Sequence, residues 1–412
     1  MARIRAFYGI RPTKEKAKEV AALPYDVYSR KEAYEFVKAN PQSFLAIDRG
    51  ETLLGEGVDM YGEEAYQSSK SELKKRIEQG IFIKEDRPCI YLYELTMDGR
   101  SQTGIVACAS IDDYLGNAIK KHENTRQEKE EDRIRHIDVC STQTGPIFLA
   151  YRKNEKVERI VETEKKKEAL YDFVTEDGIG HRVWKIEEEK IIEKLVELFD
   201  GIENLYIADG HHRAASAVKV GLKRRETHPD YTGKEEFNFF LSVIFPDDQL
   251  HIMDYNRVVK DLGGQSEEAF LKGLEESFVV TRVTEAVSPK HKGEFGMYLK
   301  DTWYRLVLKE ECKLTDRVKS LDVSYLQDLV LAPMLGIKNP KTDKRIDFVG
   351  GIRGLKELEK RVKGGYALAF SMYPTSMEEL FSVADENLLM PPKSTWFEPK
   401  LRSGLFLHEI EE

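Results

Sequence analysis

A strand-to-helix junction in the middle of the chain constrains the fold more than any other segment. Leu205–Ala208 is a short apolar run typical of a buried strand, and Asp209 and Gly210 suit the cap and the sharp turn that start a helix. The alanine-rich run Ala214–Val220 then predicts the helix, with Gly221 as its expected end. The chain should therefore contain a layer in which a buried strand leads directly into a helix.

The first turn of this expected helix carries groups that suit an anion. Unpaired N–H groups and the positive end of the helix dipole face whatever lies before a helix. His211, His212 and Arg213 add side-chain donors to the same turn. We interpret the junction as a phosphate site. An ordinary helix start with solvated side chains is the alternative, and a metal site is less favoured because adjacent histidines on a helix point in different directions.

Length and composition restrict the class of protein. A chain of 412 residues is long enough for two or three domains, and its hydrophobic content of 41% fits a soluble globular protein. No apolar run approaches the roughly 20 residues of a membrane span, and the first residues lack a secretory signal, so we expect no membrane contact and a cytoplasmic location. The net charge of -9 argues against a general nucleic-acid binder.

The cysteines follow no ligand or disulfide pattern. They are scattered without any CxxC spacing, so we expect them to be reduced and structural: Cys89, Cys108, Cys140 and Cys312.

The expected elements come in a mixed order that favours an α+β (mixed α/β) architecture over a Rossmann sheet, and neither GxGxxG nor GxxxxGK[ST] occurs. Gly263-Gly264 is the clearest boundary, which predicts domains over 1–262 and 263–412. Helices are expected over Lys31–Ala39, Ala65–Gly80, Glu187–Phe199, Glu267–Phe278 and Val323–Leu335, and strands over Cys89–Leu95, Thr103–Ser110, Pro146–Tyr151, Phe239–Phe245, Phe295–Leu299, Trp303–Leu308 and Arg345–Gly351.

A second polar concentration lies at His122 and Glu123. The pair follows the apolar residue Ile119 and should stand at the end of a strand or in a loop. A carboxylate beside a histidine in such a place suits removal of a proton from a hydroxyl group. The charged run that follows, Gln127–Arg135, is most simply a solvated helix with pairs four residues apart.

The third concentration is the segment 390–404. Pro391, Pro392 and Pro399 stiffen it as an extended loop outside regular secondary structure. Such a loop would present donors to phosphate oxygens from a rigid frame. The candidate donors are Lys393, Ser394, Thr395 and Lys400. A strap that packs Trp396 and Phe397 on the core is the alternative, and the two descriptions are compatible. Pro24–Val27, near the N-terminus, reads as a simple turn that could approach the site.

These motifs carry a resemblance. Ile207–Arg213 resembles the nucleotide-binding signature of the ParB/sulfiredoxin superfamily, in the form found in free L-serine kinases, where a DGHHR motif opens the corresponding helix. The pair His122-Glu123 and the loop Pro392–Thr395 agree with that subgroup. From Pro24 to its end the chain also resembles a broad prokaryotic family catalogued as a domain of unknown function. It is longer than the kinases, with extra segments before residue 85 and between 125 and 200.

The resemblance implies a ParB/sulfiredoxin-like catalytic core over 1–262, with an N-terminal extension and insertions, and a C-terminal α+β domain over 263–412 whose terminal loop 390–404 returns to the active site. The implied reaction is phosphoryl transfer to the hydroxyl of free serine, giving O-phosphoserine, within serine metabolism and cysteine biosynthesis. Glu123 would be the general base, with His122 beside it and His212 also catalytic. Asp209 would hold the acceptor or Mg²⁺. Donor phosphates would be bound by Gly210, His211, His212, Arg213, Lys393, Ser394 and Thr395.

The phosphate donor stays open among ATP, ADP and pyrophosphate. The expected partners are free serine and the donor, without nucleic acid or membrane, and a homodimer is a possible assembly. A CTP-switch partitioning protein would need a basic helix-turn-helix domain, and a sulfiredoxin-like reductase would need a cysteine where His211 stands. A non-catalytic nucleotide- or amino-acid-binding regulator of the same superfamily remains the alternative function.

Overall fold

The computed structural model describes residues 2–125 and 127–411, and the chain divides into two compact units. Unit 1 consists of Met1–Lys121, Thr125–Leu250 and Pro399–Glu412, and unit 2 of His122–Asn124 and His251–Glu398. The expected boundary at Gly263-Gly264 instead lies within unit 2. Strand β14 (Tyr255–Val259), which precedes it, pairs there with β18 (Ile346–Gly350) and β19 (Leu368–Ser371). The C-terminal segment belongs to unit 1 because β21 (Leu407–Glu409) pairs there with β2 (Gly9–Pro12) and β7 (Thr142–Gln143).

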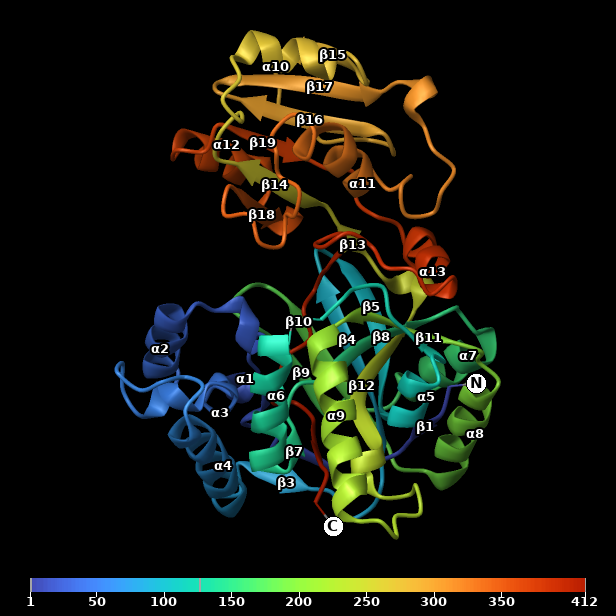
Figure 1. Cartoon of the computed structure of the whole chain (residues 1–412). Helices are drawn as coiled ribbons and strands as arrows, with labels where there is room; N and C mark the ends of the chain where they lie inside the picture. Colours follow the sequence, from blue (N-terminus) through green and yellow to red (C-terminus); the bar gives the residue numbers. More distant parts are fainter. Residues whose placement is uncertain (1, 126, 412) are drawn as a thin grey trace. The chain divides into compact units, whose positions relative to one another are not determined.

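Unit 1 is built on a nine-stranded mixed sheet with the order β6-β11-β8-β12-β5-β4-β10-β9, in which β1 also pairs with β5 (Figure 1). Most neighbours are antiparallel, whereas β6 with β11 and β8 with β12 are parallel. This mixture agrees with the expected α+β class. The strands are β1 (Ile4–Arg5), β4 (Ile90–Met97), β5 (Arg100–Ser110), β6 (Ile119–Lys120), β8 (Ile147–Tyr151), β9 (Tyr171–Val174), β10 (Gly180–Ile186), β11 (Leu205–Asp209) and β12 (Phe239–Pro246).

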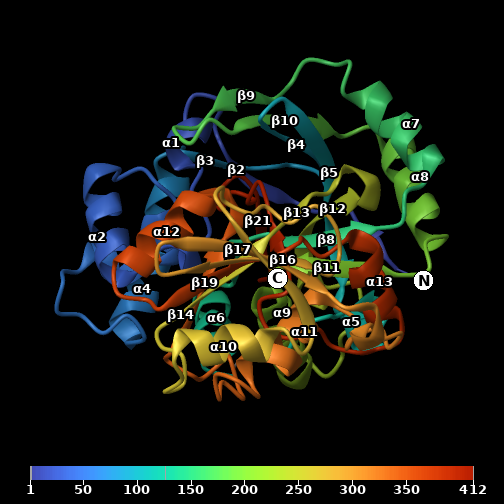
Figure 2. The same cartoon turned by 90° about the horizontal axis from the view of Figure 1, so that it is seen from above.

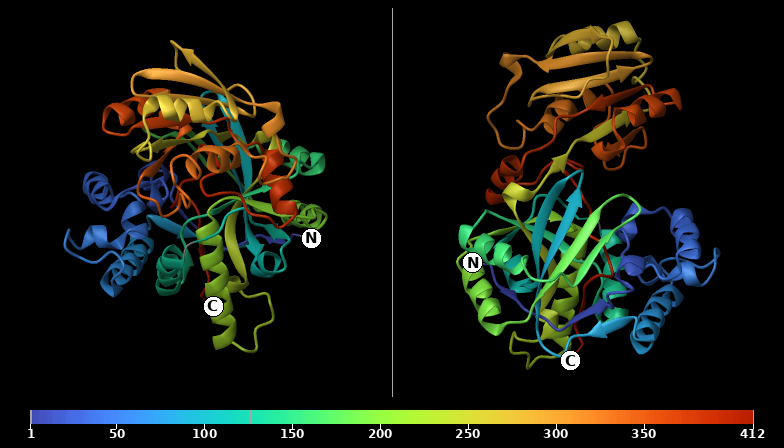
Figure 3. Two further views of the ribbon diagram at one scale, coloured as in Figure 1. Left: turned by 45° about the horizontal axis from the view of Figure 1, so that its top comes forward. Right: turned by 180° about the vertical axis from the view of Figure 1, so that it is seen from behind.

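Helices α6 and α9 lie side by side on one face of this sheet (Figure 1), and α4 packs beside α6. Seen from behind, the strands β4 and β5 are not covered by these two helices (Figure 3, right). Helix α2 starts after Ser29, a residue type that favours a helix N-cap, and Glu32 completes a capping box there. The helices of unit 1 are α1 (Ala17–Val20), α2 (Arg30–Ala39), α3 (Leu45–Asp48), α4 (Glu63–Glu78), α5 (Ile111–Leu115), α6 (Gln127–Cys140), α7 (Glu155–Glu164), α8 (Glu189–Asp200) and α9 (His211–Thr227), with short 3-10 turns such as η1 (Tyr25–Val27) and η2 (Gly50–Leu53).

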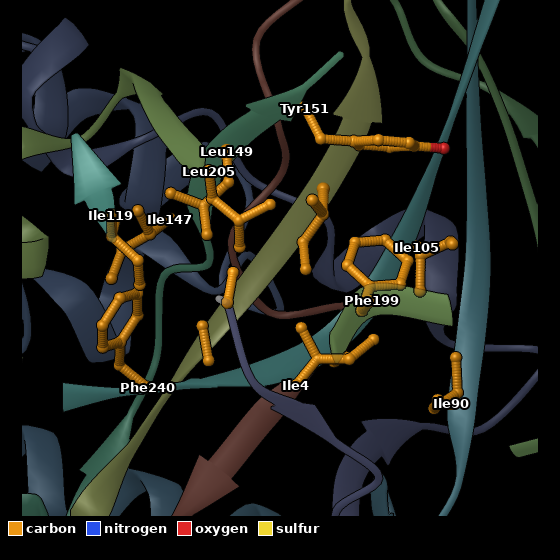
Figure 4. Close-up of a cluster of buried hydrophobic side chains, with 14 of the residues drawn as sticks. Ile4, Ile90, Ile105, Ile119, Ile147, Leu149, Tyr151, Phe199, Leu205 and Phe240 are labelled. Atoms are coloured by element: carbon orange, nitrogen blue, oxygen red, sulfur yellow. The ribbon is translucent and has the colours of Figure 1, made fainter. Parts of the chain in front are cut away.

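The main core of unit 1 collects β-branched and aromatic side chains from the sheet and from the helices against it (Figure 4). Tyr151 of β8 and Phe199 of α8 meet there with ring centroids 5.2 Å apart. A second cluster around Phe44 is formed by α1 to α4 and by a small sheet with the order β3-β2-β21-β7. The strands of that sheet are β2 (Gly9–Pro12), β3 (Phe82–Lys84), β7 (Thr142–Gln143) and β21 (Leu407–Glu409).

Unit 2 has a six-stranded antiparallel sheet with the order β15-β17-β16-β19-β14-β18. Helix α12 packs on β14, β16 and β19 (Figure 2), and α10 lies against β15 (Figure 1). The expected helix over Glu267–Phe278 ends at Leu274, since Phe278 starts β15, and the one over Val323–Leu335 is α11 followed by a π-helical turn at Gln327–Leu331. The elements are β13 (Ile252–Met253), β14 (Tyr255–Val259), α10 (Glu267–Leu274), β15 (Phe278–Val283), β16 (Glu294–Leu299), β17 (Thr302–Leu308), α11 (Asp322–Leu326), β18 (Ile346–Gly350), α12 (Leu355–Lys363), β19 (Leu368–Ser371), α13 (Met377–Asp385) and β20 (Trp396–Phe397).

Two helix predictions in unit 1 were also wrong in extent or exposure. Helix α9 does not end at Gly221 but continues to Thr227, and Gly221 is buried inside it, where a Cβ atom would lie 2.4 Å from the carbonyl oxygen of Phe237. Helix α6 is not simply solvated, because Asp132, Arg133 and His136 are buried between it and its neighbours. Among the described residues, the helices are too short or too polar to cross a membrane.

Candidate functional site

Strand β11 runs into helix α9 through one residue, Gly210. Gly210 has φ 94°, in the left-handed region that favours glycine, and it is itself the helix N-cap. The prediction of Asp209 as the N-cap was therefore wrong: Oδ1 of Asp209 accepts the N–H of Gly210 at 2.9 Å instead. A Cβ atom on Gly210 would lie 3.0 Å from Nε of Arg213, so glycine also leaves room for the guanidinium group.

Two cations flank Asp209 in unit 1. Nζ of Lys400 lies 3.1 Å from Oδ2 of Asp209, and Nη2 of Arg213 lies 3.9 Å from the same oxygen. Burial alone would raise the pKa of Asp209, but Lys400 and Arg213 together hold that pKa well below its ordinary value. The turn thus combines an ionised carboxylate with two cations at the start of a helix, and Lys400 joins it from the C-terminal loop.

The structure does not fit Asp209 as a metal ligand. Its two carboxylate oxygens accept from the Gly210 N–H and from Lys400. Within residues 2–125 and 127–411, no group of three His, Cys, Asp or Glu side chains has an arrangement that would hold a metal ion. We therefore assign no magnesium site to Asp209.

The two histidines of the motif differ in burial. His211 is buried, whereas His212 is half-buried at the start of α9. The carbonyl oxygen of His212 accepts the hydroxyl of Ser216 at 2.8 Å, which secures the first turn. His212 is therefore the more accessible of the two side chains.

A pocket in unit 1 borders Arg213. Nη1 of Arg213 donates to the carbonyl oxygen of Pro146 at 2.7 Å, and a Cβ atom on Gly145 would lie 3.4 Å from Cδ of Arg213. Tyr25 of the turn η1 also lines the pocket, so the Pro24–Val27 segment forms a turn and approaches the motif as well. The pocket is lined by Pro24, Tyr25, Asp48, Arg133, His136, Ile137, Gln143, Thr144, Gly145, Ile147, Arg213, Ala217 and Ser403.

Sequence reasoning did not find Asp48, Arg133 or His136 as site residues. One signal was available for Asp48, because its carboxylate directly follows the apolar run Phe44–Ile47. Charged side chains are rarely buried unless they are paired or bind a ligand, and Asp48 is buried.

Unit 2 brings the His-Glu pair together with the Pro-Lys-Ser-Thr loop. Nε2 of His122 lies 3.3 Å from Oγ1 of Thr395, and the carbonyl oxygen of His122 accepts the N–H of Met390 at 2.8 Å. His122 is buried and Glu123 is half-buried. The contact between His122 and Thr395 joins two motifs that lie 273 positions apart in the sequence. The two motifs therefore form one cluster.

Within this loop the predicted donors differ in orientation. Ser394 is buried, and its hydroxyl donates to the carbonyl oxygen of Pro391 at 2.6 Å. Lys393 is exposed with φ 60°, a strained value for a residue with a side chain, and its carbonyl oxygen accepts from Nη2 of Arg257 at 3.0 Å. Lys393 is thus presented outward by a fixed backbone, and the buried Arg257 is a supporting residue that the sequence did not reveal.

The aromatic residues of the loop pack as the strap interpretation predicts. Trp396 and Phe397 form β20, which pairs with β13, so this part is a short strand and not irregular as expected. Their main chain is free to pair because the prolines lie on either side of the strand and not within it. The ring of Trp396 lies edge-on to Tyr255 with centroids 4.9 Å apart.

Comparison with models of known families finds one family that matches most of the chain. The model of the family described as "Protein of unknown function (DUF1015)" matches residues 4–324. The chain belongs to this family. No curated protein matches the DUF1015 chain significantly.

Solved structures similar to the DUF1015 chain have low sequence identity. A mutant free serine kinase in complex with AMP is 17% identical, with 71% of this chain and 87% of that chain covered and a TM-score of 0.36. A mutant free serine kinase in complex with ADP is 16% identical, with the same coverage and a TM-score of 0.35. A conserved hypothetical protein from Pyrococcus furiosus is 16% identical, with 73% and 93% covered and a TM-score of 0.34.

Proposed function

We propose that this DUF1015 protein is a small-molecule kinase that transfers a phosphoryl group from a nucleotide or pyrophosphate to the hydroxyl of free L-serine, giving O-phosphoserine. The observation that carries the proposal is the turn between β11 and α9. There a left-handed Gly210 opens a helix of 17 residues, and Arg213 and Lys400 stand beside it. Phosphoryl transfer needs positioning and charge neutralisation above all, and this turn supplies both.

The donor phosphates are assigned to this turn. The helix dipole at the start of α9 attracts an anion, and Gly210 lets the backbone approach it closely. Arg213 offers a guanidinium that binds phosphate oxygens in pairs, and His211 and His212 add ring N–H groups. Lys400, which sequence reasoning placed only in the loop, joins this group of cations because it lies next to Asp209. Asp209 orients Lys400 and, in this proposal, holds no metal.

The acceptor chemistry is assigned to the cluster in unit 2. Glu123 removes the proton from the serine hydroxyl. His122 contacts Thr395, and this contact holds the His122-Glu123 pair in position. Lys393 and Thr395 supply donors to the transferred group, whereas the Ser394 hydroxyl holds the loop through Pro391.

The core of unit 1 is assigned to the ParB/sulfiredoxin-like type on the strength of its DGHHR motif.

The donor is ATP, ADP or pyrophosphate, and any Mg²⁺ would arrive with the phosphates, because no protein ligand is assigned to it. In this proposal the protein works on free metabolites in the cytoplasm. The competing description is a regulator that binds the same ligands without turnover.

The test is a screen of the full-length protein against three donors and a panel of acceptors. ATP, ADP and pyrophosphate are each incubated with L-serine, L-threonine, L-homoserine and glycerol, with and without Mg²⁺, and products are read by phosphorus NMR. The proposal predicts O-phosphoserine with at least one donor. Binding of donor and serine by calorimetry without any phosphorylated product would identify the regulator instead.

A further inference from the structure

The pocket beside Arg213 contains two buried acceptor atoms to which no residue in 2–125 or 127–411 donates a hydrogen bond. Asp48 and His136 are 3% and 1% exposed and both line the pocket. Oδ1 of Asp48 accepts the hydroxyl of Thr144 at 2.8 Å, but Oδ2 accepts no hydrogen bond from the described residues. A buried carboxylate oxygen without a donor is costly, so this oxygen points to a ligand that donates.

The second acceptor is Nδ1 of His136. Nε2 of the same ring lies 2.9 Å from the carbonyl oxygen of Ile47, which can only accept, so Nε2 carries the proton. Burial lowers the pKa of His136, with Arg133 acting in the same direction, and both effects favour the neutral ring. Nδ1 then has a free lone pair, and no described residue donates to it.

The neighbouring cation does not satisfy these atoms. Nε of Arg133 donates to Asp132 at 2.8 Å, its Nη atoms lie 3.4 Å from the main-chain carbonyl oxygen of Asp48, and its guanidinium stacks on Tyr25 at 3.9 Å. Arg133 therefore binds the backbone of Asp48 and leaves the free carboxylate oxygen to the pocket.

A protonated primary amine fits these atoms best. It carries up to three donors and a positive charge for Asp48, and Nδ1 of a neutral imidazole accepts one of those donors. A hard metal ion fits poorly, because one carboxylate and one imidazole nitrogen are too few oxygen ligands. Arg213, which is assigned above to the donor phosphates, lies on the border of the same pocket.

We propose that this pocket binds the amino group of the small amino acid on which the protein acts, through Asp48 and His136. That the ligand is serine rests on the proposed kinase function, whereas the selection of an amine rests on the pocket alone. The pocket thereby determines specificity: it selects hydroxyl compounds that carry an ammonium group over those that carry only a carboxylate.

The test is calorimetric titration of the full-length protein with L-serine, with ethanolamine, which keeps the amine and hydroxyl, and with 3-hydroxypropionate, which keeps the carboxylate and hydroxyl. We expect binding of the first two and at least about 10-fold weaker binding of the third. Asp48→Asn keeps the acceptor for Thr144 and the main-chain contact of Arg133, and it should weaken amine binding by about 10- to 100-fold.

Asp113→Asn is the matched control, because Asp113 is a buried carboxylate of unit 1 outside the pocket that pairs with Arg3. It should leave amine binding unchanged. A second measurement does not depend on a variant: serine should shift the ¹⁵N resonance of Nδ1 of His136 in the wild-type protein.

Equal binding of serine by Asp48→Asn and wild type, or tighter binding of 3-hydroxypropionate than of ethanolamine, would overturn the proposal. So would an unchanged His136 resonance at saturating serine, which would identify ordered water as the only occupant. Amine binding that depends on Asp48 without any phosphorylated product would preserve this inference and reject the kinase.

Discussion

Nζ of Lys400 lies 3.1 Å from Oδ2 of Asp209, although the two residues are 191 positions apart in the chain. The contact joins the C-terminal segment to the turn that starts α9. It gives the turn a cation that the DGHHR motif does not contain, and it keeps Asp209 ionised.

The first prediction concerns this pair. A carboxyl group with a lowered folded pKa contributes stability above its ordinary pKa of about 3.9 and loses it as the pH falls. Lys400→Ala should therefore reduce the free energy of unfolding at pH 7, with a smaller reduction at pH 3. Urea unfolding at both pH values measures this, with Lys167→Ala, which removes an ion pair to Glu164, as the control. A reduction of equal size at both pH values would contradict the role of Asp209.

The second prediction concerns Arg213. Its guanidinium should bind phosphate oxygens in a paired geometry that water replaces poorly, so Arg213→Ala should weaken binding of the phosphate donor by about 10- to 100-fold. Calorimetry with ADP and pyrophosphate measures the change. Lys223→Ala, an exposed cation near the other end of α9, controls for net charge and should have no effect. Unchanged donor affinity in a folded Arg213→Ala protein would remove this residue from the donor site.

The third prediction concerns Lys393 in its left-handed conformation. Lys393→Met keeps an unbranched side chain but removes the ammonium, whose Nζ lies 5.6 Å from the centroid of the Tyr255 ring. The change should lower kcat by about 10- to 1000-fold if the ammonium stabilises the transferred group. Serine kinetics with Lys356→Met on α12 as the control tests this. A variant with normal kcat and a raised KM would show that Lys393 only assists binding.

The fourth prediction concerns Asp322 in unit 2. Burial raises its pKa to about 7, against the opposing effect of the Gly293 N–H, which its carboxylate accepts at 2.9 Å. A raised folded pKa means that stability is lost as the pH rises from about 4 through 7. Asp322→Asn, which can still accept from Gly293, should therefore be more stable than wild type by about 1 to 3 kcal/mol at pH 8 and similar at pH 4. Thermal unfolding at the two pH values decides the matter.

Much of the fold was accessible from local patterns in the sequence. β4, β5, β8 and β12 lie where apolar and β-branched residues cluster, and α2 begins at its Ser29 capping signal. The sequence did not predict the extent of α9. Glycine has a low helix propensity, so Gly221 suggested a helix end, but here it lies inside the helix because Phe237 packs closely against it. The division into units also depends on long-range pairing of β14 and β21, which no local pattern encodes.

For the candidate site, the sequence predicted the motifs but not the buried charged residues that contact them or line the pocket. The contact between His122 and Thr395 agrees with the grouping of two motifs by resemblance. Asp48, Arg133 and Arg257 were missed because no local pattern distinguishes them from other charged residues, and each is buried only when distant segments pack around it. The charge pattern of α6 predicted solvation for the same reason: it does not show which face is covered.

The central claim is that Glu123 activates the hydroxyl of free serine for phosphoryl transfer. The most direct measurement is the initial rate of O-phosphoserine formation by wild type and by Glu123→Gln, followed by phosphorus NMR with the donor identified in the screen. The account predicts measurable product with wild type and a kcat lowered by about 100-fold or more in the variant, with donor affinity little changed. Equal rates for the two proteins, or no O-phosphoserine from wild type with any of the three donors, would contradict it.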